Sequence, residues 1–112
     1  MKIKETDING VKLIAIEEKD ANLSVADDFR EWVFSKITES EKNQLIISFK
    51  KVEYVDSSFL GALVSILKKL LPLQGKLVLI EMNTEILNLF ELTRLDKVFA
   101  LEKSLDNALK HF

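Results

Sequence analysis

Two patterns of hydrophobic residues alternate along the chain. Short apolar runs predict strands, and longer segments with apolar residues every three or four positions predict helices. The predicted strands cover residues 3–6, 11–17, 45–49, 77–80 and 98–101, and an extended segment with Val52 and Val55 continues up to Asp56. The predicted helices follow Ser24, begin at Ser57, cover residues 86–92, and follow Ser104. Strands separated by helices of this length indicate an α/β layer fold with parallel neighbours in the sheet.

Turn and cap residues mark where several of these elements begin and end. Asn9-Gly10 separates the first two strands and is the dipeptide favoured in tight hairpin turns. Ser24, with Asp27 three residues later, is a capping pair typical of a helix start. The long helix that begins at Ser57 is expected to end before Pro72, because a residue that precedes proline disfavours helical backbone.

The composition excludes most kinds of catalytic site. The 112 residues carry 16 Lys and Arg against 18 Asp and Glu, no Cys, and a single His beside the C-terminus, His111. Disulfides, thiol nucleophiles and zinc sites built on Cys are excluded, and so is any catalytic or metal site that needs several His. The near-neutral charge gives no reason to expect nucleic-acid binding, which depends on neutralising phosphates. We expect no enzyme activity, no cofactor and no metal site.

Length and hydropathy indicate one domain over residues 1–112, since domains commonly have roughly 100–150 residues. No apolar stretch approaches the roughly 20 residues that span a bilayer. The charged N-terminal residues do not fit a signal peptide. We therefore expect a cytoplasmic protein without a membrane segment, and the sequence does not predict whether it self-associates.

The junction between a predicted strand and the long helix carries unusual chemistry. Val55-Asp56-Ser57-Ser58-Phe59-Leu60-Gly61 places three small polar residues where the helix starts. Asp or Ser there is an ordinary N-cap, which accepts a hydrogen bond from a free backbone N–H. The alternative is a phosphorylation site, because the helix dipole and the free N–H groups favour a dianion. No His is placed to act as a base and no phosphate-binding glycine loop is present, so the hydroxyl would be a substrate and not a nucleophile.

This junction resembles the signature of STAS domains, the anti-sigma factor antagonists of bacteria. In that family a strand ends in Asp-Ser-Ser/Thr-Gly-Leu-Gly and passes into a helix, as residues 52–63 do here. Residues 75–79 match the family's Gly followed by a strand, and residues 89–99 are similar to its Leu-x-Leu-Thr-Gly-Leu-Asp-x-x-Phe motif. The resemblance covers residues 44–109 well and the first forty more loosely. It implies a mixed sheet of four or five strands, with about four helices mainly on one face.

The resemblance also implies a partner-switching function. Family members bind an anti-sigma factor that is also a serine kinase; phosphorylation of the motif breaks the complex, and a PP2C-type phosphatase restores it. Carried over to this chain, Ser58 is the phosphate acceptor, and Ser57 is the second choice and the expected helix cap. Asp56 is then the acidic residue that shapes the site. The other expected partner contacts are Phe59, Gly61 and Asp20, the last matching an Asp that the family has in a loop near the phosphosite.

Two residues depart from the family pattern. Phe59 stands where the family usually has Gly, and it is either packed under the adjacent loop or an exposed aromatic anchor for a partner. Arg94 replaces the Gly of the second motif, where it takes either a strained positive φ or a solvated helix end. A constitutive STAS subunit, which docks on a transporter or a signalling complex without phosphorylation, is the alternative function, and Phe59 fits it better than Gly does.

Overall fold

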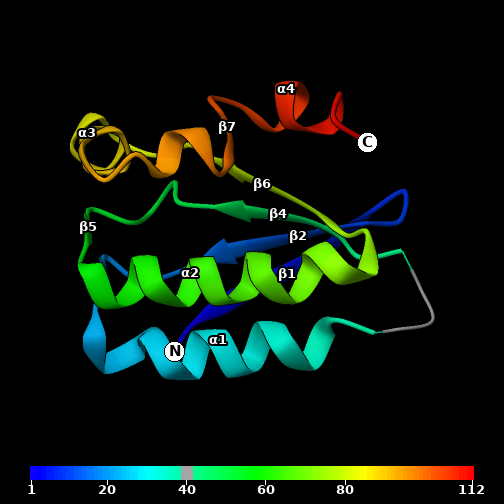
Figure 1. Ribbon diagram of the computed structural model, residues 1–112, viewed down its shortest axis with the longest axis horizontal. Helices are drawn as coiled ribbons and strands as arrows, with labels where there is room; N and C mark the ends of the chain where they lie inside the picture. Colours follow the sequence, from blue (N-terminus) through cyan, green and yellow to red (C-terminus); the bar gives the residue numbers. More distant parts are fainter. Residues whose placement is uncertain (39–41) are drawn as a thin grey trace.

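The computed structural model describes residues 1–38 and 42–112 (Figure 1). Its larger sheet has five strands in the order β1-β2-β4-β6-β7. The strands are β1 (Ile3–Ile8), β2 (Val11–Ile16), β4 (Gln44–Ser48), β6 (Lys76–Ile80) and β7 (Ala100–Glu102). β1 is antiparallel to β2, and the remaining neighbours are parallel, so the sheet is mixed.

Most of the helical structure covers one face of this sheet. The described residues form α1 (Leu23–Lys36), α2 (Ser57–Leu70), α3 (Thr84–Leu92) and α4 (Leu105–Leu109), with two short 3-10 helices, η1 (Leu71–Leu73) and η2 (Leu95–Lys97). Figure 1 shows α1 and α2 side by side, with α4 on the opposite side of the sheet. The predicted fold class, a mixed sheet of four or five strands with about four helices mainly on one face, is confirmed.

The two faces of the sheet carry separate hydrophobic layers. On one face, Ile14 and Ile47 join the buried residues of α1, α2 and α3. On the other face, Ile46 and Val78 pack with Ala108 from α4. β4 and β6 are covered on both faces, which explains why they are continuous apolar runs rather than alternating ones.

The predicted hairpin at Asn9-Gly10 is confirmed. Both residues have positive φ, 51° for Asn9 and 86° for Gly10, as a type I′ turn requires. The turn fixes the register in which Ile8 faces Val11 and Ile3 faces Ile16.

A second, two-stranded sheet was not predicted from the sequence. β3 (Asp20–Ala21) and β5 (Tyr54–Val55) pair in parallel, with Asp20 opposite Tyr54 and Ala21 opposite Val55. The extended backbone up to Asp56 was predicted, but strands of two residues are too short to produce a periodic pattern, so only the fold reveals their pairing. The pairing holds the segment that enters α1 beside the segment that enters α2.

Arg94 has both of the properties that were considered for it. It follows α3 with a φ of 62°, in the left-handed region, and its side chain is exposed. Glycine takes this conformation without a steric cost, whereas in Arg the Cβ atom is strained against the following carbonyl oxygen. The chain therefore keeps the backbone shape of a helix end that normally uses Gly.

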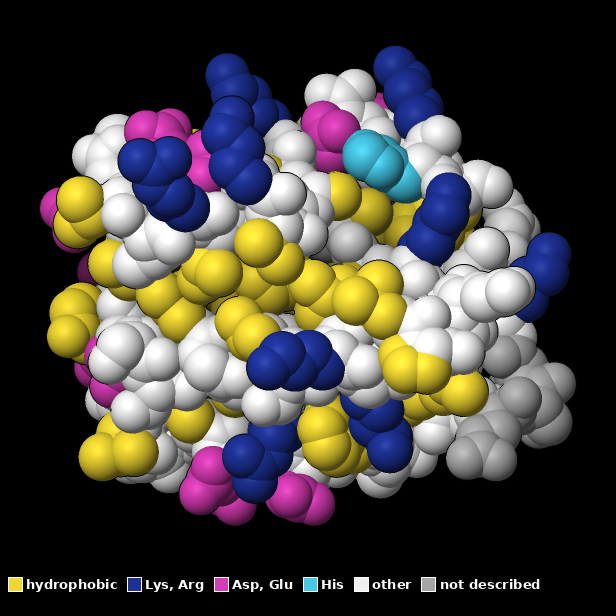
Figure 2. Space-filling view, viewed as in Figure 1, with side chains coloured by type: hydrophobic (Ala, Val, Ile, Leu, Met, Phe, Trp, Pro, Cys, Tyr) yellow, Lys and Arg dark blue, Asp and Glu magenta, His cyan; other side chains and the backbone are white. Residues whose placement is uncertain are grey.

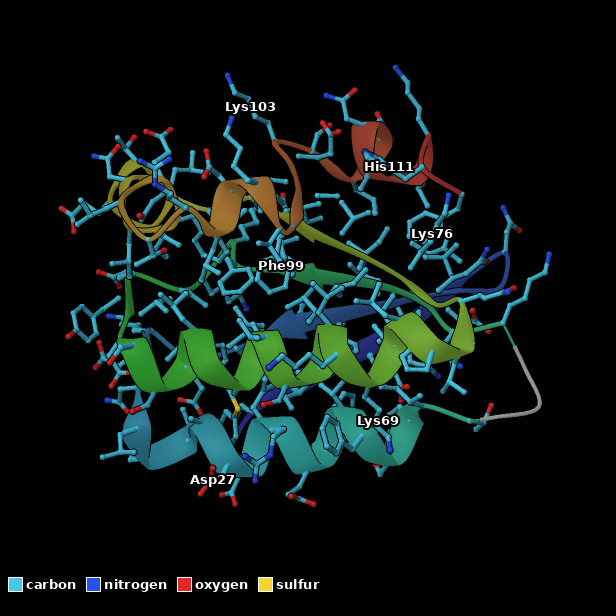
Figure 3. All side chains as sticks on the ribbon, viewed as in Figure 1. Asp27, Lys69, Lys76, Phe99, Lys103 and His111 are labelled. Atoms are coloured by element: carbon cyan, nitrogen blue, oxygen red, sulfur yellow. The ribbon has the colours of Figure 1, made fainter. Side chains whose placement is uncertain are left out.

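The C-terminus is held against the sheet. His111 lies near Lys76 (Figure 3), and the Lys76 ammonium donates a hydrogen bond to the His111 carbonyl oxygen at 2.6 Å. The His111 ring nitrogen Nε2 is 2.7 Å from a Glu102 carboxylate oxygen. These contacts tie the end of α4 to β6 and β7.

Candidate functional site

Asp56 joins the starts of the two long helices. It is the N-cap of α2, where its Oδ1 accepts a hydrogen bond from the Phe59 N–H at 3.0 Å. Its Oδ2 accepts a second hydrogen bond from the Leu23 N–H at 2.8 Å, the first residue of α1. The Asp56 N–H in turn donates to the Ala21 carbonyl in β3. One carboxylate thus satisfies free N–H groups of both helices.

Two predicted helix caps are wrong. Asp56 caps α2, so Ser57 is the first residue of the helix and not its cap. Asn22 caps α1, where its Oδ1 accepts hydrogen bonds from both the backbone N–H and the hydroxyl of Ser24. Ser24 therefore lies inside the first turn. Asn and Asp are as good at this position as Ser, so sequence alone did not separate the candidates.

The serine pair lies at the open end of α2. Ser57 is exposed and Ser58 is half-buried. No acceptor within the described residues is bonded to the backbone N–H of either serine. Because α1 also starts beside Asp56, two helix N-termini meet here, and both favour an added negative charge.

Phe59 is a core residue. Its ring is fully buried and stacks on Phe29, with ring centroids 5.0 Å apart, and it meets the edge of Phe49 at 6.5 Å. The interpretation of Phe59 as packed under its surroundings is confirmed. The interpretation as an exposed partner anchor is wrong, because α2 turns this residue inward.

The structure brings most of the other expected contacts to the same end of the molecule. Asp20 is exposed in β3, beside the strand that leads into Asp56. Gly61 is exposed one turn into α2, and a Cβ added there would meet no atom within 4 Å beyond its chain neighbours and the backbone of its own helix. The α2 start therefore presents a low, open surface next to the serines.

Sequence reasoning missed a hollow beside Ser57. It has a volume of about 410 Å³ and lies between the start of α2 and α3. Its lining is Glu53, Tyr54, Val55, Asp56, Ser57, Glu85, Ile86 and Leu89. The α3 residues are thirty positions away in sequence, and no motif linked them to the serines. The hollow combines apolar walls with three carboxylates.

Within residues 1–38 and 42–112, no group of three or more His, Cys, Asp or Glu is arranged to hold a metal ion. Over the same residues, no helix has the length and hydropathy needed to cross a membrane.

The fold and the serine pair define an α/β domain that presents a hydroxyl at a helix start. A family model described as STAS domain matches residues 7–108, so the chain belongs to the STAS family. A protein of Thermotoga neapolitana, named as a candidate anti-sigma factor antagonist, is 28% identical over 98 residues, 88% of this chain and 87% of its own length.

Solved structures agree with this assignment. An anti-sigma factor antagonist from Mycobacterium paratuberculosis has a TM-score of 0.85 at 24% identity, covering 98% of this chain and 92% of that one. The Bacillus protein SpoIIAA in its phosphorylated form has a TM-score of 0.73 at 14% identity, covering 98% of both chains. At these identities the likeness establishes the shared fold.

Asp56→Ala is expected to lower the free energy of unfolding by about 2 kcal/mol, because it removes a helix cap and a second charge-assisted hydrogen bond. Asp56→Asn keeps an acceptor for only one of the two N–H groups and should cost about half as much. Ser104→Ala, which removes the single cap of α4, is the matched control and should cost about 1 kcal/mol or less. Urea unfolding measures all three; equal losses for Asp56→Ala and Ser104→Ala would contradict the double role.

Proposed function

We propose that this protein is an anti-sigma factor antagonist that works by partner switching. Unphosphorylated, it binds an anti-sigma factor with serine kinase activity and so frees the sigma factor. Phosphorylation of Ser58 releases it, and a PP2C-type phosphatase restores binding. We place it in the bacterial cytoplasm, where sigma factors act. The serine pair at the α2 start, with free N–H groups and no neighbouring His, is the observation that carries the proposal.

The surface around the serines suits a protein partner. Leu23 is 71% exposed and Tyr54 55% exposed, next to the two helix starts. Figure 2 shows a band of hydrophobic side chains along the side of α2 that faces α3. Asp20, Glu53 and Glu85 add exposed carboxylates at the serine end. A partner with an apolar centre and basic edges would be complementary to this surface.

A phosphate on Ser58 would act on the complex and not on the fold. It adds about −1.5 to −2 charges and three strong acceptors. The two helix starts tolerate this charge in the free protein. In a complex, the dianion would lose water beside the Asp56 carboxylate and any carboxylate of the partner, which costs several kcal/mol. Binding is therefore turned off while the domain stays folded.

The constitutive alternative loses one of its supports. The argument for a constitutive subunit was that the bulky Phe59 lies beside the phosphate acceptor. The Phe59 ring is buried, however, and Ser58 is half-exposed at the helix surface. The Bacillus relative of the same fold, solved in a phosphorylated form, further supports a switch.

Incubation with ATP and the cognate anti-sigma kinase tests the proposal. We expect one phosphoryl group by intact mass, retained by Ser57→Ala and lost by Ser58→Ala, because only the second hydroxyl is the acceptor. Ser65→Ala, on the same helix one turn beyond Gly61, is the control for a general effect of serine removal. An unmodified wild-type protein, or a phosphate that survives in Ser58→Ala, would contradict the assignment.

A further inference from the structure

A trough lies on the face of the sheet opposite α1 and α2, away from the serine pair. Its volume is about 330 Å³, at the lower end of the roughly 300–1,000 Å³ of small-molecule sites. It is lined by residues of β1, β2, β4 and β6, by residues that closely follow β2, β4 and β6, and by Leu105 at the start of α4. The trough is independent of the proposed switch.

The trough exists because small residues occupy the middle of one cross-strand row. Lys4, Ala15, Ser48 and Ile80 lie side by side on neighbouring strands. The side chains of Ala15 and Ser48 are short, so the surface of the sheet is depressed between Lys4 and Ile80. α4 packs mainly on β6 and β7, and the hydrophobic cluster around it also includes Val11 at the start of β2. The low part of the row stays open, with Leu105 as one wall.

The trough carries a surplus of positive charge. It is lined by the side chains of Lys4, Lys50 and Lys51 and by two glutamates. Lys51 forms a 2.6 Å ion pair with Glu17. The ammonium groups of Lys4 and Lys50 have no acidic partner among the described residues.

The other glutamate, Glu81, forms no ion pair with the described lysines and is held by a specific contact. Its Oε1 accepts a hydrogen bond from the buried Ser48 hydroxyl at 2.8 Å. Its backbone has a φ of 62°, a conformation that costs about 1 kcal/mol or more for a residue with a Cβ. The strained residue directly follows β6, and ligands of open α/β sheets commonly bind beyond the carboxyl ends of the strands.

We propose that this trough binds a small monocarboxylate with a short, linear apolar body. The body rests on Leu13, Ala15 and Ile80 against Leu105, which supply the apolar floor and wall. The carboxylate meets the free ammonium groups of Lys4 and Lys50 at the mouth. Lys51 is neutralised by Glu17, and Glu81 offsets one of the two remaining lysines, so the trough keeps one surplus positive charge. This charge balance favours a monoanion over a phosphate dianion.

Titration of the full chain with octanoate, followed by amide correlation NMR, tests the site. We expect saturable shifts confined to the trough, including Ala15, Ser48, Lys50 and Leu105. Lys50→Glu should weaken binding at least about tenfold, because it replaces an attraction by a repulsion. Ala15→Leu fills the low part of the row and should abolish binding. Lys68→Glu makes the same charge change on α2, beyond the other face of the sheet, and should leave the affinity unchanged.

Several results would overturn the proposal. They are shifts centred outside the trough, equal affinity for octylammonium, and equal affinity for inorganic phosphate, which lacks the apolar body. Unchanged affinity in Lys50→Glu would also overturn it, and because Lys50 is exposed this variant tests the site without disturbing the core. None of these results bears on phosphorylation of Ser58, so the two proposals fail separately.

Discussion

Replacing Phe59 by alanine is expected to lower the free energy of unfolding by about 3–5 kcal/mol, the usual cost of emptying a buried aromatic site. The ring has no exposed surface and touches both Phe29 in α1 and Phe49 after β4. Its removal leaves a cavity where α1, α2 and the sheet meet. Since domains of this size are stable by only about 5–15 kcal/mol, the variant should remain folded with little margin.

Chemical denaturation and thermal melting measure this loss of stability. We expect the Tm of Phe59→Ala to fall by more than about 10 °C. Phe59→Leu keeps most of the apolar volume and should cost less than half as much. Phe34→Ala is the matched control, because that ring is only half-buried and packs beside the Lys69 ammonium. A Phe59→Ala variant as stable as Phe34→Ala would contradict the central position of Phe59 in the core.

Ser58→Glu is expected to weaken binding of the anti-sigma factor at least about a hundredfold, which corresponds to about 2.7 kcal/mol. The new carboxylate lies at the first turn of α2, where the free N–H groups tolerate it in the unbound protein. In the complex this carboxylate loses its hydration next to the Asp56 carboxylate, and no opposite charge compensates for the desolvation. The stability of the free variant should stay within about 0.5 kcal/mol of the wild type, as for ordinary surface changes.

Ser57→Glu is the matched control, since it adds the same charge one residue earlier in the same turn. It should weaken binding less, and isothermal titration calorimetry gives the ratio of the two dissociation constants. Equal loss in both variants would show a general charge effect at this end of the molecule and would contradict a specific role of Ser58.

The sequence predicted the large elements because their signals are local. The Asn9-Gly10 turn, the apolar runs of β4 and β6 and the helix from Ser57 each depend on neighbouring residues. The residues that cap the two long helices were harder to predict. Asn22, Ser24, Asp56 and Ser57 are all good cap residues, and the choice between them came from the β3–β5 pairing, which positions Asp56 against the Leu23 N–H.

Features that combine distant segments could not be read from the sequence. Phe59 was ambiguous because its burial depends on Phe29 and Phe49, which belong to other elements. The hollow beside Ser57 depends on α3, and the trough depends on strand register, which puts Ala15 beside Ser48. In each case the sequence contains the residues, and the fold decides which of them meet.

The most direct test of the proposed switch is the affinity of one protein preparation for the anti-sigma factor in three states. The protein is titrated as purified without phosphate, after phosphorylation by the kinase, and after subsequent treatment with a PP2C-type phosphatase. We predict tight binding in the first state, a loss of at least about a hundredfold in the second, and full recovery in the third. Equal affinity in all three states would contradict partner switching.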